Sequence, residues 1–285
     1  GLEKLKNNPN ILKIYKQIKG TTSLQQSLSL INVNPSVWAQ GYTGKGQTIC
    51  VVDSGINYTH PSLGACGYTN NISDGSCSKV IGGYDFINND ANPYDDFYHG
   101  TAIAGVAAAK GTINGTAPDA KIVAVKVTNS YGEWFDEDLE SGIDYCINNK
   151  ERYNISIITI SLGLGLFNNP NNCNSFGGGI AINEAHNLGM FIDASSGNNG
   201  DLTRISHPGC VSNATSVCAV HDANLGRERD FGVFDSENCF DSNVHADDIS
   251  CFTNRGNLLD LLAPGNRINA PQILGGYIEN WGTSV

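Results

Sequence analysis

Residues 47–55 read QTICVVDSG, an apolar run that ends in a carboxylate, Asp53, and a glycine turn. A short apolar run rich in β-branched residues and bounded by turn residues predicts a buried β-strand. Burying an unpartnered carboxylate is costly, so Asp53 at the mouth of this strand needs a partner. The alternative is a turn aspartate that caps the next element.

The same pattern returns along the chain. Further strands are predicted at AKIVAVKV (120–127), ISIITISLG (155–163) and MFIDASSG (190–197), and helices at GTAIAGVAAAK (100–110), DEDLESGIDYCINN (136–149) and GGGIAINEAHNLG (177–189). Alternating helices and apolar strands predict an α/β fold of three αβα layers, with a mainly parallel central sheet covered on both faces. Functional groups in such folds gather at the carboxyl ends of the strands. Residues 221–250 lack periodicity and are interpreted as a surface insertion.

The charge and hydropathy of the chain exclude several classes of partner. The 28 acidic and 17 basic residues give a net charge of −11, and the basic residues do not cluster. Nucleic acids and anionic membranes need a concentrated positive surface, so neither is expected as a partner. No apolar run approaches 18 residues, so no transmembrane helix is predicted. Because the sequence opens on Gly1, a signal peptide is either absent or lies upstream.

Nine cysteines indicate an oxidising, extracytoplasmic setting. Cys66 and Cys77 bracket one polar loop, and Cys239 and Cys251 bracket another, and a disulfide would stabilise each loop. A zinc site is the alternative, but it requires closely spaced Cys or His pairs, and the sequence contains no CxxC. We therefore expect no metal site, and the odd count leaves one cysteine unpaired within the chain.

Two further residues carry candidate chemistry. His99 stands directly before the predicted small-residue helix, where an imidazole could take and return a proton near neutral pH. The alternative is an ordinary loop histidine at a helix start. Ser284 follows Gly282 in WGTSV, where a helix beginning at the serine would direct its N–H groups at an oxyanion. Alone, Ser284 carries no signal, but Asp53, His99 and Ser284 follow one known chain order of the catalytic triad.

Six segments together resemble the successive signature blocks of the subtilisin-like (subtilase) serine peptidases. They are VVDSGINYTHPSL (51–63), HGTAIAGVAAA (99–109), ITISLGLG (158–165), ASSGNNG (194–200), DLLAPG (260–265) and GTSV (282–285). The resemblance spans about residues 41–285 and implies a subtilisin-like fold. It implies that Asp53 orients the imidazole, that His99 is general base and then general acid, and that Ser284 is the acyl-forming nucleophile. Asn198 would donate to the oxyanion, although alone it reads as a turn asparagine.

The resemblance also implies where a peptide binds. Ser161, Leu162 and Gly163 on one side, and Ser195, Ser196 and Gly197 on the other, resemble the two strand edges that bind a protein or peptide substrate as an extended strand. Ser206 would lie near the floor of the main specificity pocket, with Arg204 close by. Neither position gives a side-chain preference.

The same resemblance divides the chain into two parts. Residues 1–21 resemble the end of an inhibitory propeptide, with a maturation cut between Gly20 and Ser23, and an ordinary N-terminal extension is the alternative. Residues 22–285 would form the catalytic domain, incomplete because family members continue past the serine into a buried helix. We expect the 285-residue chain on its own to show little hydrolysis.

Two departures from the family pattern concern side features. Ala102 replaces a second histidine of many members, outside the triad, and the linker KGTINGT (110–116) lacks the longer calcium-holding loop of some members. Structural calcium is therefore compatible with the sequence but not indicated, and no cofactor is required. The resemblance to this family predicts a secreted, monomeric serine endopeptidase whose partners are its substrates and its own propeptide.

Two other functions are alternatives to a serine peptidase. The first is an inactive fragment or binding module on the same scaffold, against which stands the joint presence of Asp53, His99, Asn198 and Ser284. The second is an α/β-hydrolase esterase, which is excluded because the chain contains no G-x-S-x-G and has a different triad order.

Overall fold

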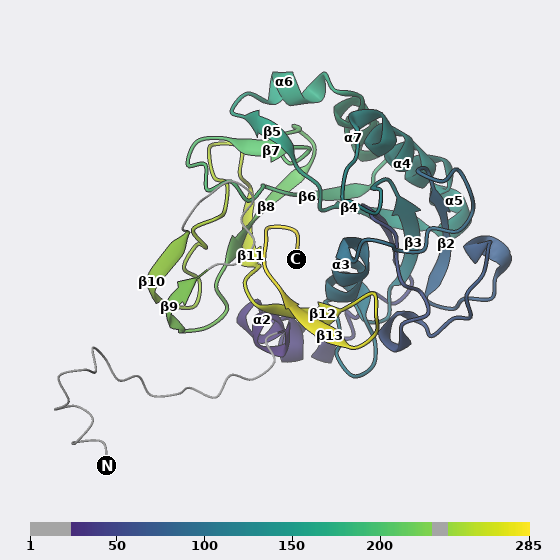
Figure 1. The fold of residues 1–285 in the computed structure, drawn as a ribbon, viewed down its shortest axis with the longest axis horizontal. Coiled ribbons are helices and arrows are strands. Elements are labelled where there is room, and N and C mark those ends of the chain that lie inside the picture. Colours follow the sequence, from purple (N-terminus) through teal and green to yellow (C-terminus); the bar gives the residue numbers. More distant parts are fainter. Residues whose placement is uncertain (1–23, 230–238) are drawn as a thin grey trace, which may run out of the picture.

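The computed structural model describes residues 24–229 and 239–285, and its centre is a seven-stranded sheet in the order β11-β8-β6-β4-β1-β3-β2 (Figure 1). All of its strand pairs are parallel. The strands are β1 (Thr48–Asp53), β2 (Val80–Asp85), β3 (Lys121–Lys126), β4 (Ile155–Ile160), β6 (Phe191–Ser195), β8 (Thr215–Val220) and β11 (Leu261–Pro264). The predicted β1, β3, β4 and β6 are confirmed.

Helices cover both faces of this sheet. The helices are α2 (Leu24–Leu30), α3 (His99–Ala108), α4 (Asp136–Asn148), α5 (Lys150–Tyr153), α6 (Pro170–Asn174) and α7 (Gly177–Asn187), with short helical turns at Val33–Val37, Pro61–Leu63 and Ile72–Asp74. Figure 1 shows α4 and α7 side by side, and the predicted α3, α4 and α7 are confirmed.

Strand β1 shows how the three layers are built. Its residues are all buried, and their side chains alternate between two cores. Cys50 and Val52 pack into the core that contains α4 and α7, whereas Ile49 and Val51 pack into the core that contains α3. Alternation along the strand explains why both faces must be apolar. The predicted αβα arrangement is confirmed.

Disulfide bonds tie these layers and loops together. Cys50 in β1 bonds Cys146 in α4, across 96 residues of chain. The two bracketing pairs predicted from the sequence, Cys66–Cys77 and Cys239–Cys251, are both formed, and Cys173 bonds Cys210. The ninth cysteine, Cys218 in β8, is free, and burial raises the pKa of its thiol to about 11.

Three two-stranded sheets surround the central one. They are the antiparallel pairs β5 (Leu164–Phe167) with β7 (Ile205–His207), β9 (Gly226–Arg229) with β10 (Phe240–Val244), and β12 (Ile268–Pro271) with β13 (Tyr277–Asn280).

Residues 221–229 and 239–250 are the described part of the segment interpreted as a surface insertion. The described part of this segment forms the β9–β10 hairpin, and it buries His221 and Val244. His221 is held by a 2.8 Å hydrogen bond between its Nε2 and Asp241. The segment is fixed by polar contacts, which leave no hydrophobic period in the sequence.

The chain's N-terminal part contributes one unpredicted helix. Leu24 and Leu28 of α2 are buried together with Ile113 and Ile268. The propeptide expected in residues 1–21 lies outside the described residues. Within residues 24–229 and 239–285, no helix is long and apolar enough to span a membrane.

Leu139 of α4 tests this packing. It is fully buried between α4, α7 and the sheet, so Leu139→Ala should lower the free energy of unfolding by about 2–5 kcal/mol. Chemical denaturation measures the change. Ile180→Ala in α7, where the side chain is 56 % exposed, is the control and should cost well below ~1 kcal/mol. Equal losses in the two variants would contradict the assigned helix faces.

Candidate active site

Asp53 and His99 form a part-buried pair at the carboxyl end of β1. Asp53 is the last residue of the strand and is 1 % exposed. Nδ1 of His99 lies 2.9 Å from both carboxylate oxygens, and one of these oxygens also accepts the N–H of Ser54 at 2.7 Å. A carboxylate accepts hydrogen bonds, so the imidazole proton lies on Nδ1. The lone pair of Nε2 is then free to accept a proton.

The start of α3 is shaped to bring this imidazole close. A Cβ on Gly100 would lie 2.2 Å from the carbonyl oxygen of Gly55 and 3.1 Å from Cβ of Asp53, so only glycine allows the helix to approach the end of β1. Tyr98, just before the histidine, has a φ of 129°. Such a conformation costs a non-glycine residue about 1–3 kcal/mol and persists only where surrounding contacts impose it.

Opposing effects set the pKa of His99. Burial lowers it, whereas the charge and hydrogen bond of Asp53, together with the charge of Asp95, raise it by more. The net pKa of His99 is raised above its ordinary value. The Asp53 carboxylate therefore favours the imidazolium, the form that appears when this side chain accepts a proton.

Ser284 lines the same cleft, but among the described residues its hydrogen bonds run to Ser161 and not to His99. Its Oγ donates to the carbonyl oxygen of Ser161 at 3.2 Å, and the Ser161 hydroxyl donates to the carbonyl oxygen of Ser284 at 2.9 Å. Within the described residues, Ser284 makes no hydrogen bond to His99. The hydroxyl must exchange Ser161 for Nε2 of His99 before it can pass on its proton, and such contacts are often long in the absence of substrate.

Asn198 is oriented by Thr283, a residue that the sequence patterns did not single out. Oδ1 of Asn198 accepts from the N–H of Thr283 at 2.8 Å and from its hydroxyl at 3.0 Å. The carboxamide nitrogen is thereby left as the donor of a side chain that lines the cleft. The Thr283 hydroxyl also accepts the N–H of Gly197 at 3.1 Å. Its position next to the predicted Ser284 was the only available signal for Thr283.

The cleft that joins these groups has a volume of about 340 Å³. Its lining includes every predicted catalytic residue and, of the predicted substrate-binding residues, Ser161, Leu162, Gly163, Ser195 and Gly197. Ser196 does not line the cleft, because it is fully buried and its backbone bonds Val217 and Ser206.

Of the two residues expected at or near the floor of the specificity pocket, Ser206 lines the cleft and Arg204 does not. Ser206 lines the cleft, and its Oγ lies 2.2 Å from where a Cβ on Gly197 would stand, so the pocket needs a glycine there. Arg204 is absent from the lining. Its guanidinium instead bonds the carboxylate of Asp201, 2.8 Å from Nε, which draws it away from the cleft.

Four aromatic residues that were not predicted from the sequence also line the cleft. Phe97, Tyr98, Tyr131 and Trp134 contribute to its lining. Tyr131 is 82 % exposed, and the rings of Phe97 and Tyr98 lie 4.5 Å apart. These rings offer apolar surface next to the imidazole.

One group of side chains within the described residues has the spacing of a metal site. Cys173, His207 and Cys210 place their ligand atoms within 4.8 Å of one another. The two cysteines are joined in a disulfide, which removes both thiolates. The residues present therefore do not fit a metal ion in the oxidised protein.

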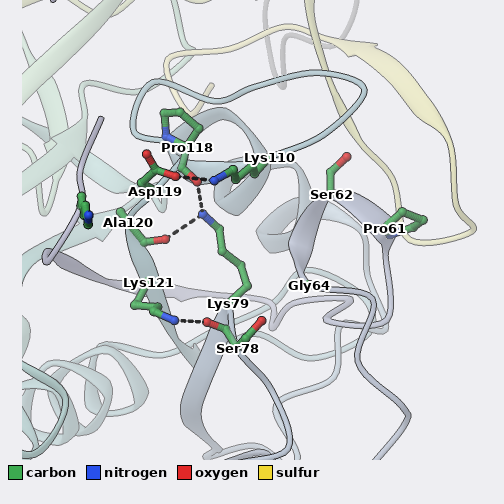
Figure 2. A pocket seen from close by; sticks show the side chains of 11 residues that line it. Pro61, Ser62, Gly64, Ser78, Lys79, Lys110, Pro118, Asp119, Ala120 and Lys121 are labelled. Carbon is green, nitrogen blue, oxygen red and sulfur yellow. Dashed lines mark hydrogen bonds and ion pairs between the residues drawn. The ribbon is translucent and has the colours of Figure 1, made fainter. Parts of the chain in front are cut away.

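A larger cavity, of about 590 Å³, lies on another part of the molecule and is lined by Lys45, Lys79, Lys110 and Lys121 (Figure 2). Its cationic groups serve the fold. Nζ of Lys79 donates to the carbonyl oxygens of Pro118 and Ala120 at 2.8 and 2.7 Å, and Lys110 pairs with Asp119. The smaller cleft is therefore the candidate active site.

Comparisons with known proteins find similar sequences over most of the chain. The sequence profile described as "Subtilase family" matches residues 44–285. The chain is 31 % identical over 252 residues to a thermophilic serine proteinase of Bacillus sp. (strain AK1), covering 87 % of this chain and 51 % of that protein. It is 31 % identical over 246 residues to thermitase of Thermoactinomyces vulgaris, covering 85 % and 71 %. The chain thus spans about half the length of the first relative.

Solved structures show the same fold. A cold-adapted subtilisin-like serine proteinase matches with a TM-score of 0.62 and 24 % identity, over 85 % of this chain and 71 % of that one. Sphericase matches with a TM-score of 0.60 and 26 % identity, over 85 % and 73 %.

The Asp53–His99 pair predicts a measurable titration. The pKa of His99 should lie above 6.5 and should fall in Asp53→Asn, because the neutral amide no longer stabilises the imidazolium. A raised folded-state pKa stabilises the fold below pH 6.5, and this contribution is lost as the pH rises through the folded value. NMR titration of the imidazole signals measures the shift. An unchanged His99 titration in the variant would contradict the pairing.

Lys79 predicts a second pH dependence. Burial lowers the pKa of its ammonium to about 8 from the ordinary 10.5, so the unfolded chain binds more protons between these values. The free energy of unfolding should therefore rise with pH across this window, and Lys79→Met should remove that rise. Chemical denaturation at pH 8 and pH 10.5 tests this expectation. The proteins compared are the wild type, Lys79→Met and the control Lys150→Met. Parallel slopes for all three proteins would refute the assignment.

Proposed function

The chain belongs to the subtilase family, and on this premise we propose that it is a serine endopeptidase. In this proposal Asp53, His99 and Ser284 form the catalytic triad, and Asn198 donates to the oxyanion. One observation carries the proposal. Both carboxylate oxygens of the buried Asp53 lie 2.9 Å from Nδ1 of His99, in a cleft that Ser284 and Asn198 also line.

The first half of the reaction acylates the enzyme. Oγ of Ser284 attacks the carbonyl carbon of the scissile peptide while Nε2 of His99 takes its proton. The Asp53 carboxylate stabilises the resulting imidazolium and fixes the ring by its bonds to Nδ1. The tetrahedral intermediate collapses as His99 returns the proton to the leaving amine, and the acyl group stays on Ser284.

The second half uses water in place of the amine. His99 takes a proton from a water molecule that attacks the acyl carbon, and returns it to Oγ of Ser284 as the carboxylic acid leaves. In both halves negative charge develops on the carbonyl oxygen. The carboxamide N–H of Asn198 can donate to that oxygen because Thr283 occupies Oδ1. No step requires a cofactor.

The substrate is proposed to be a protein or peptide bound as an extended strand. Ser161–Gly163 on one side, and Ser195 and Gly197 on the other, would supply the edges. Oγ of Ser195 links the two sides by a 3.1 Å hydrogen bond to the carbonyl oxygen of Leu162. The exposed ring of Tyr131 and its aromatic neighbours provide apolar surface for substrate side chains.

The proposal extends to the setting of the enzyme. The disulfides support an extracytoplasmic location, since such bonds persist in oxidising compartments, and we propose a secreted monomer. Residues 1–21 are proposed as the end of an inhibitory propeptide, a partner in cis, and residues 22–285 as peptidase domain.

A non-catalytic binding module is the alternative function. Such a module has no need of an imidazole whose Nδ1 is bonded to a carboxylate while Nε2 stays unbonded among the described residues. A serine-directed phosphonate separates the two functions.

We expect the phosphonate to label Ser284 of the full-length protein, detected by mass spectrometry of the peptides. Ser284→Ala should prevent labelling and lower kcat by at least about 10⁴-fold. His99→Ala should slow labelling because the hydroxyl then lacks its base. Peptide hydrolysis that survives in Ser284→Ala, or a wild-type protein that remains unlabelled, would overturn the proposal.

Asn198→Ala should lower kcat by about 10²–10³-fold with little change in KM, because the lost donor acts on the transition state. Asn171→Ala, an exposed residue of α6 outside the cleft, is the matched control and should leave both constants unchanged. Steady-state kinetics on a chromogenic peptide measures the effect. A fall in kcat common to both variants would argue against the oxyanion role.

A further inference from the structure

A second buried carboxylate, Asp95, stands behind the proposed triad. Its side chain is fully buried, and its two oxygens accept five hydrogen bonds. Oδ1 accepts from the Ser54 hydroxyl at 2.9 Å and from the N–H groups of Phe97 and Tyr98 at 3.0 Å. Oδ2 accepts from the N–H and hydroxyl of Thr101. Asp95 therefore joins the end of β1, its own loop and the first turn of α3.

Hydrogen bonds through Ser54 connect the Asp95 carboxylate to both members of the Asp53–His99 pair. Its hydroxyl donates to Asp95 and accepts the N–H of Gly100 at 2.9 Å, while its own N–H donates to Asp53 at 2.7 Å. A single serine thus connects Asp95 to the carboxylate of Asp53 and to the residue after His99. Displacement of Asp95 would disturb both sides of the pair.

The backbone of His99 is bracketed by the same contacts. Tyr98, on one side of it, has the strained φ of 129°, and its N–H is held by Asp95. On the other side, the N–H of Gly100 donates to the Ser54 hydroxyl, and the N–H of Thr101 donates to Asp95 itself. Because strain persists only where contacts impose it, the Asp95 carboxylate is what fixes the backbone from which the imidazole projects.

Asp95 also acts by its charge. The ionisable groups facing His99 are Asp53 at the end of β1, Asp95 in the loop, and the ring of Tyr98 at 6.5 Å between centroids. Within the described residues Asp95 forms no ion pair, so its negative charge is balanced by hydrogen bonds alone. Burial raises the pKa of the Asp95 carboxyl, whereas the hydrogen bonds from Thr101, Tyr98 and Phe97 act to lower it.

We propose that Asp95 is a positioning residue of the hydrolytic reaction, acting through Ser54 and the Tyr98 backbone to hold His99 against Asp53. The inference rests on the proposed function, because it assigns Asp95 to the same site. Asp95 does not line the cleft and would not touch the substrate. The competing role is purely structural, as an anchor of the first turn of α3.

Asp95→Asn distinguishes the two roles. The amide keeps the size of the side chain but turns one acceptor into a donor, which then faces an N–H of Tyr98 or Thr101. Counting active sites with the phosphonate, we expect kcat per site to fall about ten- to a hundredfold, because a displaced base costs this much, while KM changes less than about twofold. The acidic limb of the pH profile of kcat/KM should move to lower pH, since the imidazolium loses a stabilising charge.

Asp96→Asn is the matched control, one residue along the same loop. Its carboxylate is 46 % exposed and pairs with the buried Lys126, which keeps Asp85 at 3.8 Å in the variant. The kcat per site and the acidic limb should therefore stay at the wild-type values. Equal kcat per site and identical acidic limbs in the two variants would overturn the proposal, because a purely structural anchor changes only the folded fraction.

Ser54→Ala provides an independent test if Asp95→Asn does not fold. It removes the relay while leaving Asp95 in place, and it should lower kcat per site in the same way but less. Where both variants fold, the double variant should lose less than the sum of the two single effects, because they act through one network. A Ser54→Ala enzyme with wild-type kcat would refute the relay. A wild-type protein that the phosphonate does not label would instead refute the proposed function.

Discussion

The candidate site depends on one interaction, the hydrogen-bonded contact between a buried carboxylate and an imidazole. Asp53 ends a strand that is buried on both faces, so water cannot solvate its charge. The charge is stabilised by Nδ1 of His99 and by the N–H of Ser54. This requirement explains the glycine after His99, since α3 can reach the end of β1 only where no Cβ intervenes.

The site is assembled from segments that are far apart in the sequence. The end of β1 and the start of α3 provide Asp53 and His99, whereas the residues after β4 and β6 face the 281–285 segment. Parallel strands bring these segments together because their carboxyl ends share one edge of the sheet. Ser161 and Ser284 then bond each other in both directions, which ties the C-terminal segment to the end of β4.

Much of this arrangement was predictable from the sequence. The apolar runs that became β1, β3, β4 and β6 are continuous, and Asp53, His99, Asn198 and Ser284 stand in motifs that together resemble one family. The elements held by polar contacts were not predictable. The β9–β10 hairpin is held by strand hydrogen bonds, and Asp95 by five hydrogen bonds of which only the one from Ser54 is distant in sequence. Such polar contacts leave no periodic pattern. Ser196 was misplaced because adjacent residues of an extended segment face opposite ways.

Thr283 makes two contacts with Asn198 and one with Gly197. It thereby ties the proposed oxyanion donor and the proposed substrate edge to the residue that precedes Ser284, the proposed nucleophile. Attack and charge stabilisation are therefore not separately adjustable. A shift of the 281–285 segment by a fraction of a residue would turn the amide away as it withdrew the hydroxyl. In the proposed reaction, displacement of this segment would remove the attacking hydroxyl and the oxyanion donor together.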